Sequence, residues 1–431
     1  MNSRRPPLHF ILLLLAYYCS THTPANGGIT VKCLPNEASS LLQLKRSFYN
    51  PNHWSWQHGT DCCHWEGVGC ERASGLVITL DLSDRNLQSK GGLSPALFNL
   101  TSLTNLSLSG NDFGLTILPN FGFEQLNNLL SLDLSVTSFV GQVPTGISHL
   151  KNLHTLDLSY NRGLYFSEPS FQMVVQNLSN LRNLYLDEVD MSRDGKNWSS
   201  SLENCVPRLQ YLSLHSCGLS GHIHSSFSIL ESLESITLSQ NSFSGKVPEF
   251  LADLSSLYIL DLFGDDFEGQ FPTKICLLKM LTWIDLSWNT RLSGHLPKFP
   301  VENSLEFLDL METNFIVATP TSFVNLKFLK FLGVSTAEVV EDTISLIPKL
   351  PSLQSLTLHR SGSEKQNFSW IANLQGLVVL HLADYNFSSS IPSWIANLTS
   401  LTSLRIEYCI LYGRIPTWIG NLTNLSNLNL D

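Results

Sequence analysis

The sequence predicts a right-handed solenoid of the α/β class, with a parallel concave sheet and a disulfide-bonded cap at its N-terminal end. The motif L-x-x-L-x-L recurs along the chain, and its first leucines are spaced by 24 residues from Leu209 to Leu425. Many copies end in G-x-I/V-P. Four cysteines crowd into one segment before the first copy. A fixed period of this length is typical of a repeat array, so 431 residues need not divide into several globular domains.

The repeat is most regular in residues 233–248 and 401–416, which follow L-x-x-L-x-L-x-x-N-x-F/L-x-G-x-V/I-P closely. Upstream of Leu209 the spacing varies from 24 to 28 residues. Fourteen complete copies and an incomplete fifteenth follow one another up to Asp431. Their first residues are Val77, Leu103, Leu129, Leu153, Leu181, Leu209, Leu233, Leu257, Leu281, Leu305, Leu329, Leu353, Leu377, Leu401 and Leu425.

Alternation within the motif predicts a short strand in each copy. In L-x-L the two leucines point to one face of a strand and the intervening residue points to the other. One copy cannot bury its leucines alone, but stacked copies bury them against each other. The closing G-x-I/V-P segment predicts a turn, because glycine adopts backbone conformations that other residues resist and proline fixes φ.

The ninth position of the motif predicts a ladder of small polar residues where the chain leaves each strand. Asparagine there can bond to turn backbone of adjacent coils. The position is filled by Asn111, Asn161, Asn241 and Asn289, by Cys217, Cys409, Thr137, Thr313, Ser361 and Asp265, and, against the pattern, by Arg85, Val189, Ala337 and Tyr385. We therefore expect Cys217 and Cys409 to be buried in the ladder. A disulfide between Cys205 and Cys217 stays open, and Cys276 has no evident partner.

The first residues predict entry into the secretory pathway. Residues 1–28 read as a signal peptide, with Arg4 and Arg5 before an apolar run at 8–18 that is too short to span a bilayer. Without Cys19, an even number of eight cysteines remains. Nine N-x-[ST] sequons predict glycosylation at Asn99, Asn105, Asn177, Asn197, Asn367, Asn386, Asn397, Asn421 and Asn424.

Residues 29–74 are predicted to form the cap, and residues 75–431 the solenoid. Residues 37–48 carry leucines at helical spacing, and Trp54, Trp56 and Trp65 follow. An open end of a solenoid would expose its leucines, so the terminal unit must differ from the others. The disulfide framework of the cap consists of Cys33, Cys62, Cys63 and Cys70, which allow three pairings. Adjacent cysteines lack the C-x2-C spacing of zinc ligands, so no metal is expected.

Charge and motifs argue against nucleic-acid binding and catalysis. The formal net charge is -10, whereas phosphate binding needs a basic face. The chain has no G-x-S-x-G, H-E-x-x-H, phosphate-loop or kinase signature, and the sequence implies no cofactor. The aspartates that recur at one strand position lie in separate strands without an enclosing loop, so they are interpreted as part of the repeat and not as a calcium site.

A protein or peptide ligand is expected on the outward positions of the central strands. Aromatic residues and methionine gather there, and this composition is typical of interface hot spots. The candidate ligand-binding residues are Tyr211, His215, Tyr258, Phe263, Trp283, Trp288, Phe307 and Met311. The alternative is that these aromatics pack on their neighbours along the sheet.

The cap and repeat together resemble plant extracellular leucine-rich-repeat proteins. Residues 37–70 carry the pattern E-A-x-x-L-L-x-L-K…W…D-C-C-x-W-x-G-V-x-C, and L-x-G-x-I/V-P is the plant form of the repeat. This resemblance covers residues 33–431. Within the group the sequence is similar to receptor-like proteins of the tomato fungal-resistance type, including those sensing Verticillium and xylanase, with supporting segments at residues 66–88, 92–113 and 139–144. The resemblance implies disulfides Cys33–Cys62 and Cys63–Cys70. It also implies an ectodomain that binds a pathogen- or plant-derived ligand and signals through a partner kinase of the leucine-rich-repeat type.

Two alternatives remain at the level of sequence. Secreted inhibitors of fungal polygalacturonase share the cap and repeat, but the resemblance implies that they have about ten repeats and a closing cap. The chain ends at Asp431 within a strand, which predicts either a fragment of a longer receptor or a nonfunctional truncated copy. We expect the full-length relative at the outer face of the cell membrane, attached through a segment absent here. A complete chain of this length would instead be secreted to the apoplast.

Overall fold

A computed structural model describes most of the chain beyond its first thirty residues. The predicted signal peptide, residues 1–28, lies outside the described part. The described residues are 31–49, 55–89, 91–167, 170–193, 198–203, 205–316, 323, 325–335, 347–359 and 368–431.

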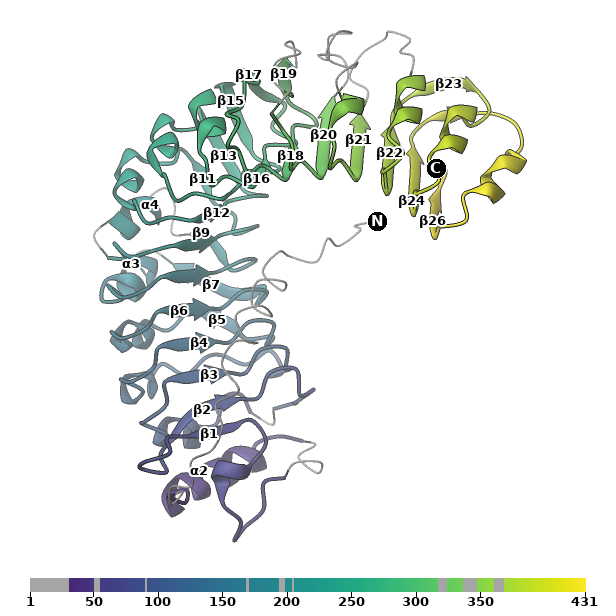
Figure 1. Ribbon diagram of the computed structural model, residues 1–431. Coiled ribbons are helices and arrows are strands. Elements are labelled where there is room, and N and C mark those ends of the chain that lie inside the picture. Colours follow the sequence, from purple (N-terminus) through teal and green to yellow (C-terminus); the bar gives the residue numbers. More distant parts are fainter. Residues whose placement is uncertain are drawn as a thin grey trace.

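The chain forms an arc of stacked coils with a sheet along its inner side (Figure 1). The cap lies at one end of the arc and the coil of β26 at the other. Short helices follow the outer side. This arrangement confirms the predicted leucine-rich-repeat solenoid with its concave sheet.

The concave sheet has sixteen strands, in which the cap contributes β1 and each copy of the repeat contributes one strand. All pairs are parallel except β1 with β2, which is antiparallel. The sequence did not predict that reversed strand. The strands in order are β1 (Val68–Cys70), β2 (Val77–Asp81), β3 (Asn105–Ser107), β4 (Ser131–Asp133), β6 (Thr155–Asp157), β8 (Asn183–Tyr185), β10 (Tyr211–Ser213), β12 (Ser235–Thr237), β14 (Ile259–Asp261), β16 (Trp283–Asp285), β18 (Phe307–Asp309), β20 (Phe331–Ser335), β21 (Ser355–His359), β22 (Val379–Ala383), β24 (Ser403–Glu407) and β26 (Asn427–Asn429).

The 24-residue register persists in the strand pairing. Leu212 of β10 lies beside Ile236 of β12, and Ile236 lies beside Leu260 of β14. All three side chains are buried, at 0 to 1% exposure. Equal spacing therefore keeps every inward side chain in line with its neighbours, and the apolar core runs through the whole solenoid.

Short parallel strands also line one flank of the solenoid, where the sequence had predicted turns. They form separate small sheets: β5 (Val140–Gln142), β7 (Gly163–Ser167) and β9 (Asp190–Arg193); β11 (Ser220–Gly221), β13 (Ser242–Gly245), β15 (Asp266–Gln270), β17 (Arg291–His295) and β19 (Asn314–Ile316); and β23 (Asn386–Ser389) with β25 (Ile410–Leu411). The glycine of the repeat, Gly245, is the last residue of β13. Its position favours glycine, because φ is +78° and an added Cβ would lie 2.4 Å from the ring of His222.

The outer side is built mostly from 3₁₀ helices. Several begin directly after the proline of the repeat, as η7 does after Pro248. The helices are α2 (Pro35–Arg46), α3 (Ser170–Val175), α4 (Trp198–Glu203), η1 (Cys62–His64), η2 (Pro95–Asn99), η3 (Phe123–Gln125), η4 (Thr145–His149), η6 (Ser225–Ile229), η7 (Glu249–Asp253), η8 (Thr273–Leu277), η11 (Ile347–Lys349), η12 (Ser369–Asn373), η13 (Ser393–Asn397) and η14 (Thr417–Asn421).

The predicted asparagine ladder, formed by Asn111, Asn161, Asn241 and Asn289, lies between the sheet and the flank. Asn289 is fully buried and accepts a hydrogen bond from the backbone N–H of Phe267 at 3.1 Å. Its amide donates to the carbonyls of Leu262 (2.8 Å) and Leu286 (2.9 Å). Each ladder residue thereby ties its own coil to the preceding one.

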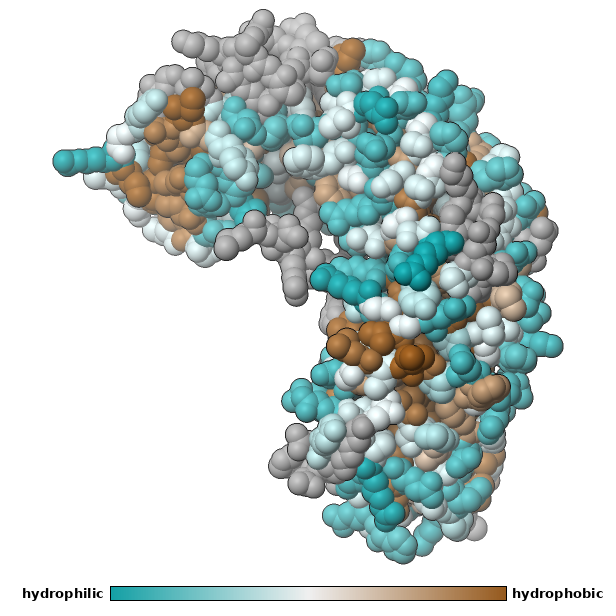
Figure 2. Space-filling view, turned by 180° about the vertical axis from the view of Figure 1, so that it is seen from behind, coloured by the Kyte–Doolittle hydropathy of each residue, from teal (hydrophilic) through white to brown (hydrophobic). Residues whose placement is uncertain are grey.

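Figure 2 shows a mostly hydrophilic surface on which apolar side chains gather in separate patches. One patch covers the last coils, where Ile410, Ile415 and Leu428 are exposed. Among the described residues, no helix has both the length and the apolar character needed to cross a membrane.

Candidate functional site on the concave face

The strand register arranges the predicted ligand-binding residues in rows along the concave face. Trp283, Phe307 and Phe331 are direct partners in β16, β18 and β20. Because parallel strands pair residue by residue here, equivalent outward side chains meet across neighbouring coils. Residues predicted separately from each copy are thus brought together.

The aromatic row, formed by Trp283, Phe307 and Phe331, is a continuous stack. The ring centroids of Trp283 and Phe307 are 3.5 Å apart with an interplanar angle of 2°, and those of Phe307 and Phe331 are 4.2 Å apart at 11°. Phe307 is only 7% exposed, so it supports its neighbours and offers little area of its own. Trp283 and Phe331 are half-buried. Phe331 was absent from the predicted set, although its 24-residue spacing from Phe307 was the available signal.

Two tyrosines form a second aromatic contact on the same face. The rings of Tyr211 and Tyr258 lie edge to face with centroids 6.2 Å apart. Tyr258 immediately precedes β14. Tyr211 pairs with Ser235, and Ser235 pairs with Ile259, so Ile259 holds the strand position equivalent to Tyr211. The Tyr211 hydroxyl donates to Oε2 of Glu234 at 2.9 Å. Glu234 thus fixes the orientation of the Tyr211 ring.

The remaining predicted residues lie where the chain leaves the strands. Trp288 adopts φ +61° and is 52% exposed, and its backbone N–H donates to the carbonyl of Met311 at 2.8 Å. His215 places Nδ1 3.0 Å from Oγ of Ser239. Phe263 and Met311 are half-buried. Trp288 is therefore the most accessible aromatic of the predicted set.

The aspartates beside the aromatic row serve the strand ends. Asp261 accepts a hydrogen bond from the N–H of Phe263 at 3.1 Å, and Asp285 accepts one from the N–H of Ser287 at 3.0 Å. Burial, with Asp285 as the neighbouring charge, raises the pKa of Asp261 to about 7. These carboxyls act as turn acceptors in the repeat, as interpreted from the sequence.

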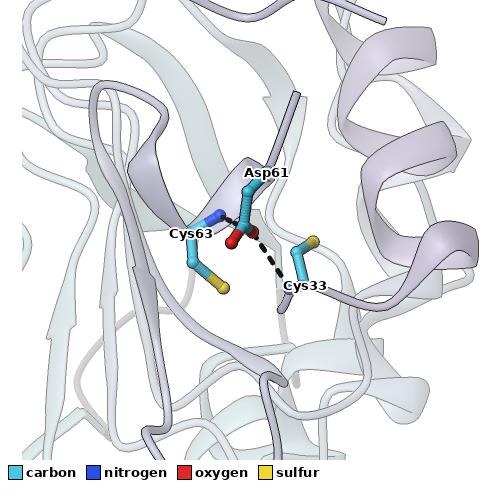
Figure 3. A group of neighbouring side chains, drawn as sticks. All are labelled: Cys33, Asp61 and Cys63. Atoms are coloured by element: carbon cyan, nitrogen blue, oxygen red, sulfur yellow. Dashed lines mark hydrogen bonds between the residues drawn. The ribbon is translucent and has the colours of Figure 1, made fainter. Parts of the chain in front are cut away.

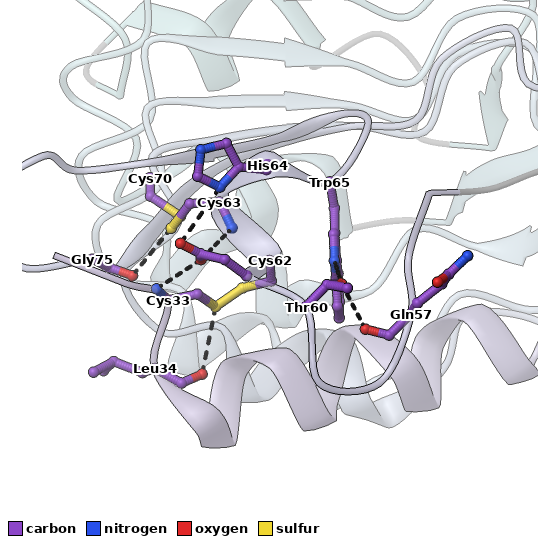
Figure 4. Close-up of polar contacts among 11 residues, drawn as sticks. Cys33, Leu34, Gln57, Thr60, Cys62, Cys63, His64, Trp65, Cys70 and Gly75 are labelled. Atoms are coloured by element: carbon purple, nitrogen blue, oxygen red, sulfur yellow. Dashed lines mark hydrogen bonds and ion pairs between the residues drawn. A yellow bond between two sulfur atoms is a disulfide. The ribbon is translucent and has the colours of Figure 1, made fainter. Parts of the chain in front are cut away.

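The cap is closed by the two disulfides that the resemblance implied. The Cα atoms are 5.5 Å apart in Cys33–Cys62 and 5.4 Å apart in Cys63–Cys70 (Figure 4). Asp61 lies between them, with Oδ1 accepting from the backbone N–H of Cys33 at 3.0 Å and of Cys63 at 3.1 Å (Figure 3). The hydrogen bond from Cys33 is the main cause that lowers the pKa of Asp61.

The cap also holds the one cluster of metal-ligand type among the described residues, Cys33, Asp61 and Cys63 (Figure 3). Both sulfur atoms are already bonded in disulfides, so they offer no thiolate to a metal. Asp61 has a structural role here, because it joins the start of α2 to η1.

Cys217 and Cys409 lie at ladder positions, but the prediction that both are buried is confirmed only for Cys217 and is wrong for Cys409. Cys217 is buried, with Sγ 3.1 Å from the carbonyl of Leu186. Cys409 is half-buried and 3.7 Å from the carbonyl of Leu382. Cys205 and Cys217 are both free thiols, and so is the buried Cys276. The local disulfide left open by the sequence is therefore not formed.

The predicted glycosylation sites lie at the surface wherever their side chains are described. Asn105 is on the concave face in β3. Asn197 and Asn367 lie outside the described residues, and only the backbone of Asn386 is described. The exposed sites are Asn99, Asn105, Asn177, Asn397, Asn421 and Asn424.

Comparison with known proteins agrees with the repeat architecture. The family "Leucine rich repeat N-terminal domain" matches residues 34–71, and the family "Leucine rich repeat" matches residues 207–267. The chain therefore contains segments that match both leucine-rich-repeat families. It is 32% identical to receptor-like protein 9DC1 of Solanum pimpinellifolium over 251 residues, or 54% of the chain and 28% of the relative.

Receptor-like protein 6 of Arabidopsis thaliana is 30% identical over 348 residues, which cover 75% of the chain and 29% of that relative. These matches confirm the resemblance to plant receptor-like proteins. The chain spans less than a third of the length of either curated relative.

Solved structures support the same fold. The leucine-rich-repeat ectodomain of the Arabidopsis receptor kinase HAESA, solved with an N-terminally extended IDA peptide hormone, has 24% identity and a TM-score of 0.64. That match covers 92% of the present chain and 77% of the HAESA chain. HAESA in complex with IDA and the co-receptor SERK1 matches with 22% identity and a TM-score of 0.53, over 92% and 82% of the two chains.

Proposed function

We propose that the chain is an extracellular recognition module of a plant receptor-like protein and not an enzyme. Its concave face binds a protein or peptide ligand around Trp283 and Trp288, and signalling passes through a partner kinase of the leucine-rich-repeat type. The full-length protein resides at the outer face of the cell membrane, after passage through the secretory pathway. The receptor-like relatives and the HAESA complexes with a peptide hormone and SERK1 support this function.

The observation that carries the proposal is the coincidence of accessible aromatics with a stretch free of sequons. The asparagines of all nine N-x-[ST] sequons lie outside residues 198–366, which contain every candidate ligand-binding residue. Trp288 is 52% exposed there, and tryptophan is the residue type most enriched among interface hot spots. A surface that must touch a partner is best left without bulky glycans.

A new glycan on this face tests the proposal. Ser235→Asn creates the sequon N-I-T in β12, at the strand position that Asn105 holds in β3. Ser235 lies beside Tyr211 and Ile259 in the register. We expect the glycan to exclude the ligand and to weaken binding by at least about 100-fold, because several anchor residues lose contact together.

The matched control places a glycan on the outer side of the same coil. Asp253→Asn creates N-L-S at the last residue of η7, the position that Asn99 holds in η2. Peptides secreted by plant tissue and by fungal cultures are passed over each immobilised glycoform and the bound peptides are identified. The proposal requires peptides that bind the original chain and Asp253→Asn equally but are lost on Ser235→Asn. Equal binding to all three glycoforms would refute it.

A further inference from the structure

At the asparagine-ladder position, the polar occupants with resolved contacts other than Asp265 place a donor group toward a backbone carbonyl. Asn289 donates through its amide to the carbonyls of Leu262 and Leu286. Where asparagine is replaced, Thr137 donates its hydroxyl to the carbonyl of Leu134 at 2.5 Å, and the Cys217 thiol lies 3.1 Å from the carbonyl of Leu186. These occupants differ in chemistry, but each carries a hydrogen that faces a buried carbonyl.

Asp265 holds this position in the coil of β14. It is 5% exposed, and its Oδ1 accepts from the N–H of Phe243 at 3.1 Å, as the amide oxygen of Asn289 accepts from the N–H of Phe267. Its Oδ2 is buried and has no hydrogen-bond partner among the described residues. By the register of the repeat, Oδ2 corresponds to the amide nitrogen of Asn289, which donates to the carbonyls of Leu262 and Leu286. A carboxylate has no hydrogen to donate to them, whereas a protonated carboxyl has one.

The charges around Asp265 also favour the protonated form. Burial is the main cause that raises the pKa of Asp265, to about 8, against the opposing backbone hydrogen bonds from Phe243 and Asn241. The charged groups acting on it are the carboxyls of Asp261 and Asp266, and both raise the pKa further. Geometry and charge therefore agree on the same state.

We propose that Asp265 keeps its proton in the folded chain and that this proton closes the ladder between the coils of β12 and β14, so that rising pH opens the centre of the concave face. Phe263 lies in this coil and Trp283 in the next one, so the protonation of Asp265 regulates the surface of the proposed site. The protonation does not depend on ligand binding, and its test is separate from the glycan experiment.

The direction of the effect follows from proton linkage. An unfolded aspartate has a pKa near 3.8, and the folded value is about 8. Between these values the folded coil holds a proton that an opened coil releases, so a higher pH favours opening. Each pH unit in this window increases the opening equilibrium by up to about tenfold, and the effect levels off above about pH 8.

Hydrogen exchange of the whole chain provides the test. Backbone amides of residues 236–267 are followed from pH 5 to pH 8 in the original chain and in Asp265→Asn, which restores the usual ladder residue. Comparison at equal pH removes the intrinsic pH dependence of exchange. We expect the opening equilibrium constant of the original chain to exceed that of Asp265→Asn. The ratio of the two constants should increase by up to about tenfold per pH unit. Amides around Asn161 should exchange equally in both.

Two further variants distinguish the effect of Asp265 protonation from a general effect of charge. Asp266→Asn removes the neighbouring exposed carboxyl, so the pH dependence should persist but level off at a lower pH, because one charge that raises the pKa of Asp265 is gone. Asp265→Thr supplies a hydroxyl, as Thr137 does, and should reduce the pH dependence to that of Asp265→Asn. The infrared band of a protonated carboxyl at pH 7 should be weaker in Asp265→Asn than in the original chain. The same pH dependence in Asp265→Asn as in the original chain, or no change in that band, would overturn the proposal.

Discussion

Replacing Asn289 by alanine is expected to lower the free energy of unfolding by about 3–5 kcal/mol. The substitution leaves the N–H of Phe267 and the carbonyls of Leu262 and Leu286 buried without this partner. Each orphaned buried group costs about 1–3 kcal/mol, and relaxation of the coil recovers part of the sum. Denaturant unfolding monitored by circular dichroism, with hydrogen exchange in the coils of β14 and β16, measures the loss.

Two variants provide reference values for this loss of unfolding free energy. Asn314→Ala removes an exposed asparagine whose amide makes one hydrogen bond, to the carbonyl of Thr290, and should cost less than about 1 kcal/mol. Asn289→Thr keeps one donor, as Thr313 does in a later coil, and should fall between the two. If Asn289→Ala cost no more than Asn314→Ala, the ladder would contribute nothing to holding the coils together.

Removing the Cys33–Cys62 disulfide by paired alanine substitutions is expected to destabilise the cap by about 3–4 kcal/mol. This bond joins residues 29 apart, whereas Cys63–Cys70 joins residues 7 apart. Constraint of the unfolded chain grows with the size of the closed loop, so loss of the shorter bridge should cost only about 2–3 kcal/mol. Hydrogen exchange in residues 35–46 and 55–70 reports the effect.

The distant coils serve as the internal control for the cap variants. Each coil of a solenoid contacts mainly its neighbours, so loosening should spread from α2 toward β2 and fade along the sheet. Exchange near β14 should stay at its original rate. A larger cost for the Cys63–Cys70 pair would contradict the chain-entropy explanation and assign the stability to contacts within the cap.

Repeat spacing was sufficient to predict the strands, because one leucine register determines which side chains face inward in every coil. The flank strands were missed, since β11 and β13 depend on hydrogen bonds between coils and not on alternation within one copy. The antiparallel pairing of β1 likewise depends on how the cap folds back. Local sequence patterns carry neither kind of information.

The candidate site was predicted only as a set of outward positions. Register alone would have added Phe331 to the aromatic row. Register alone could not have shown that Phe307 is buried between two rings, because its exposure depends on the rotamers of its neighbours. The significance of Asp265 was missed for a related reason. The sequence shows an acceptable small polar residue, and only the buried Oδ2, which has no hydrogen-bond partner among the described residues, reveals the missing donor.

The in-register strand pairing also limits how this chain can change over generations. Loss or duplication of one 24-residue unit preserves the strand register of every later coil. A shift of the register by one residue would instead turn the inward side chains of a strand outward. Genes that recombine between equivalent positions of two copies can therefore lengthen or shorten the arc without unfolding it. Deletion of the unit that begins at Leu281 would place Ile259 directly beside Phe307 and remove Trp283 from the row. Such exchanges can produce new recognition surfaces without any point substitution.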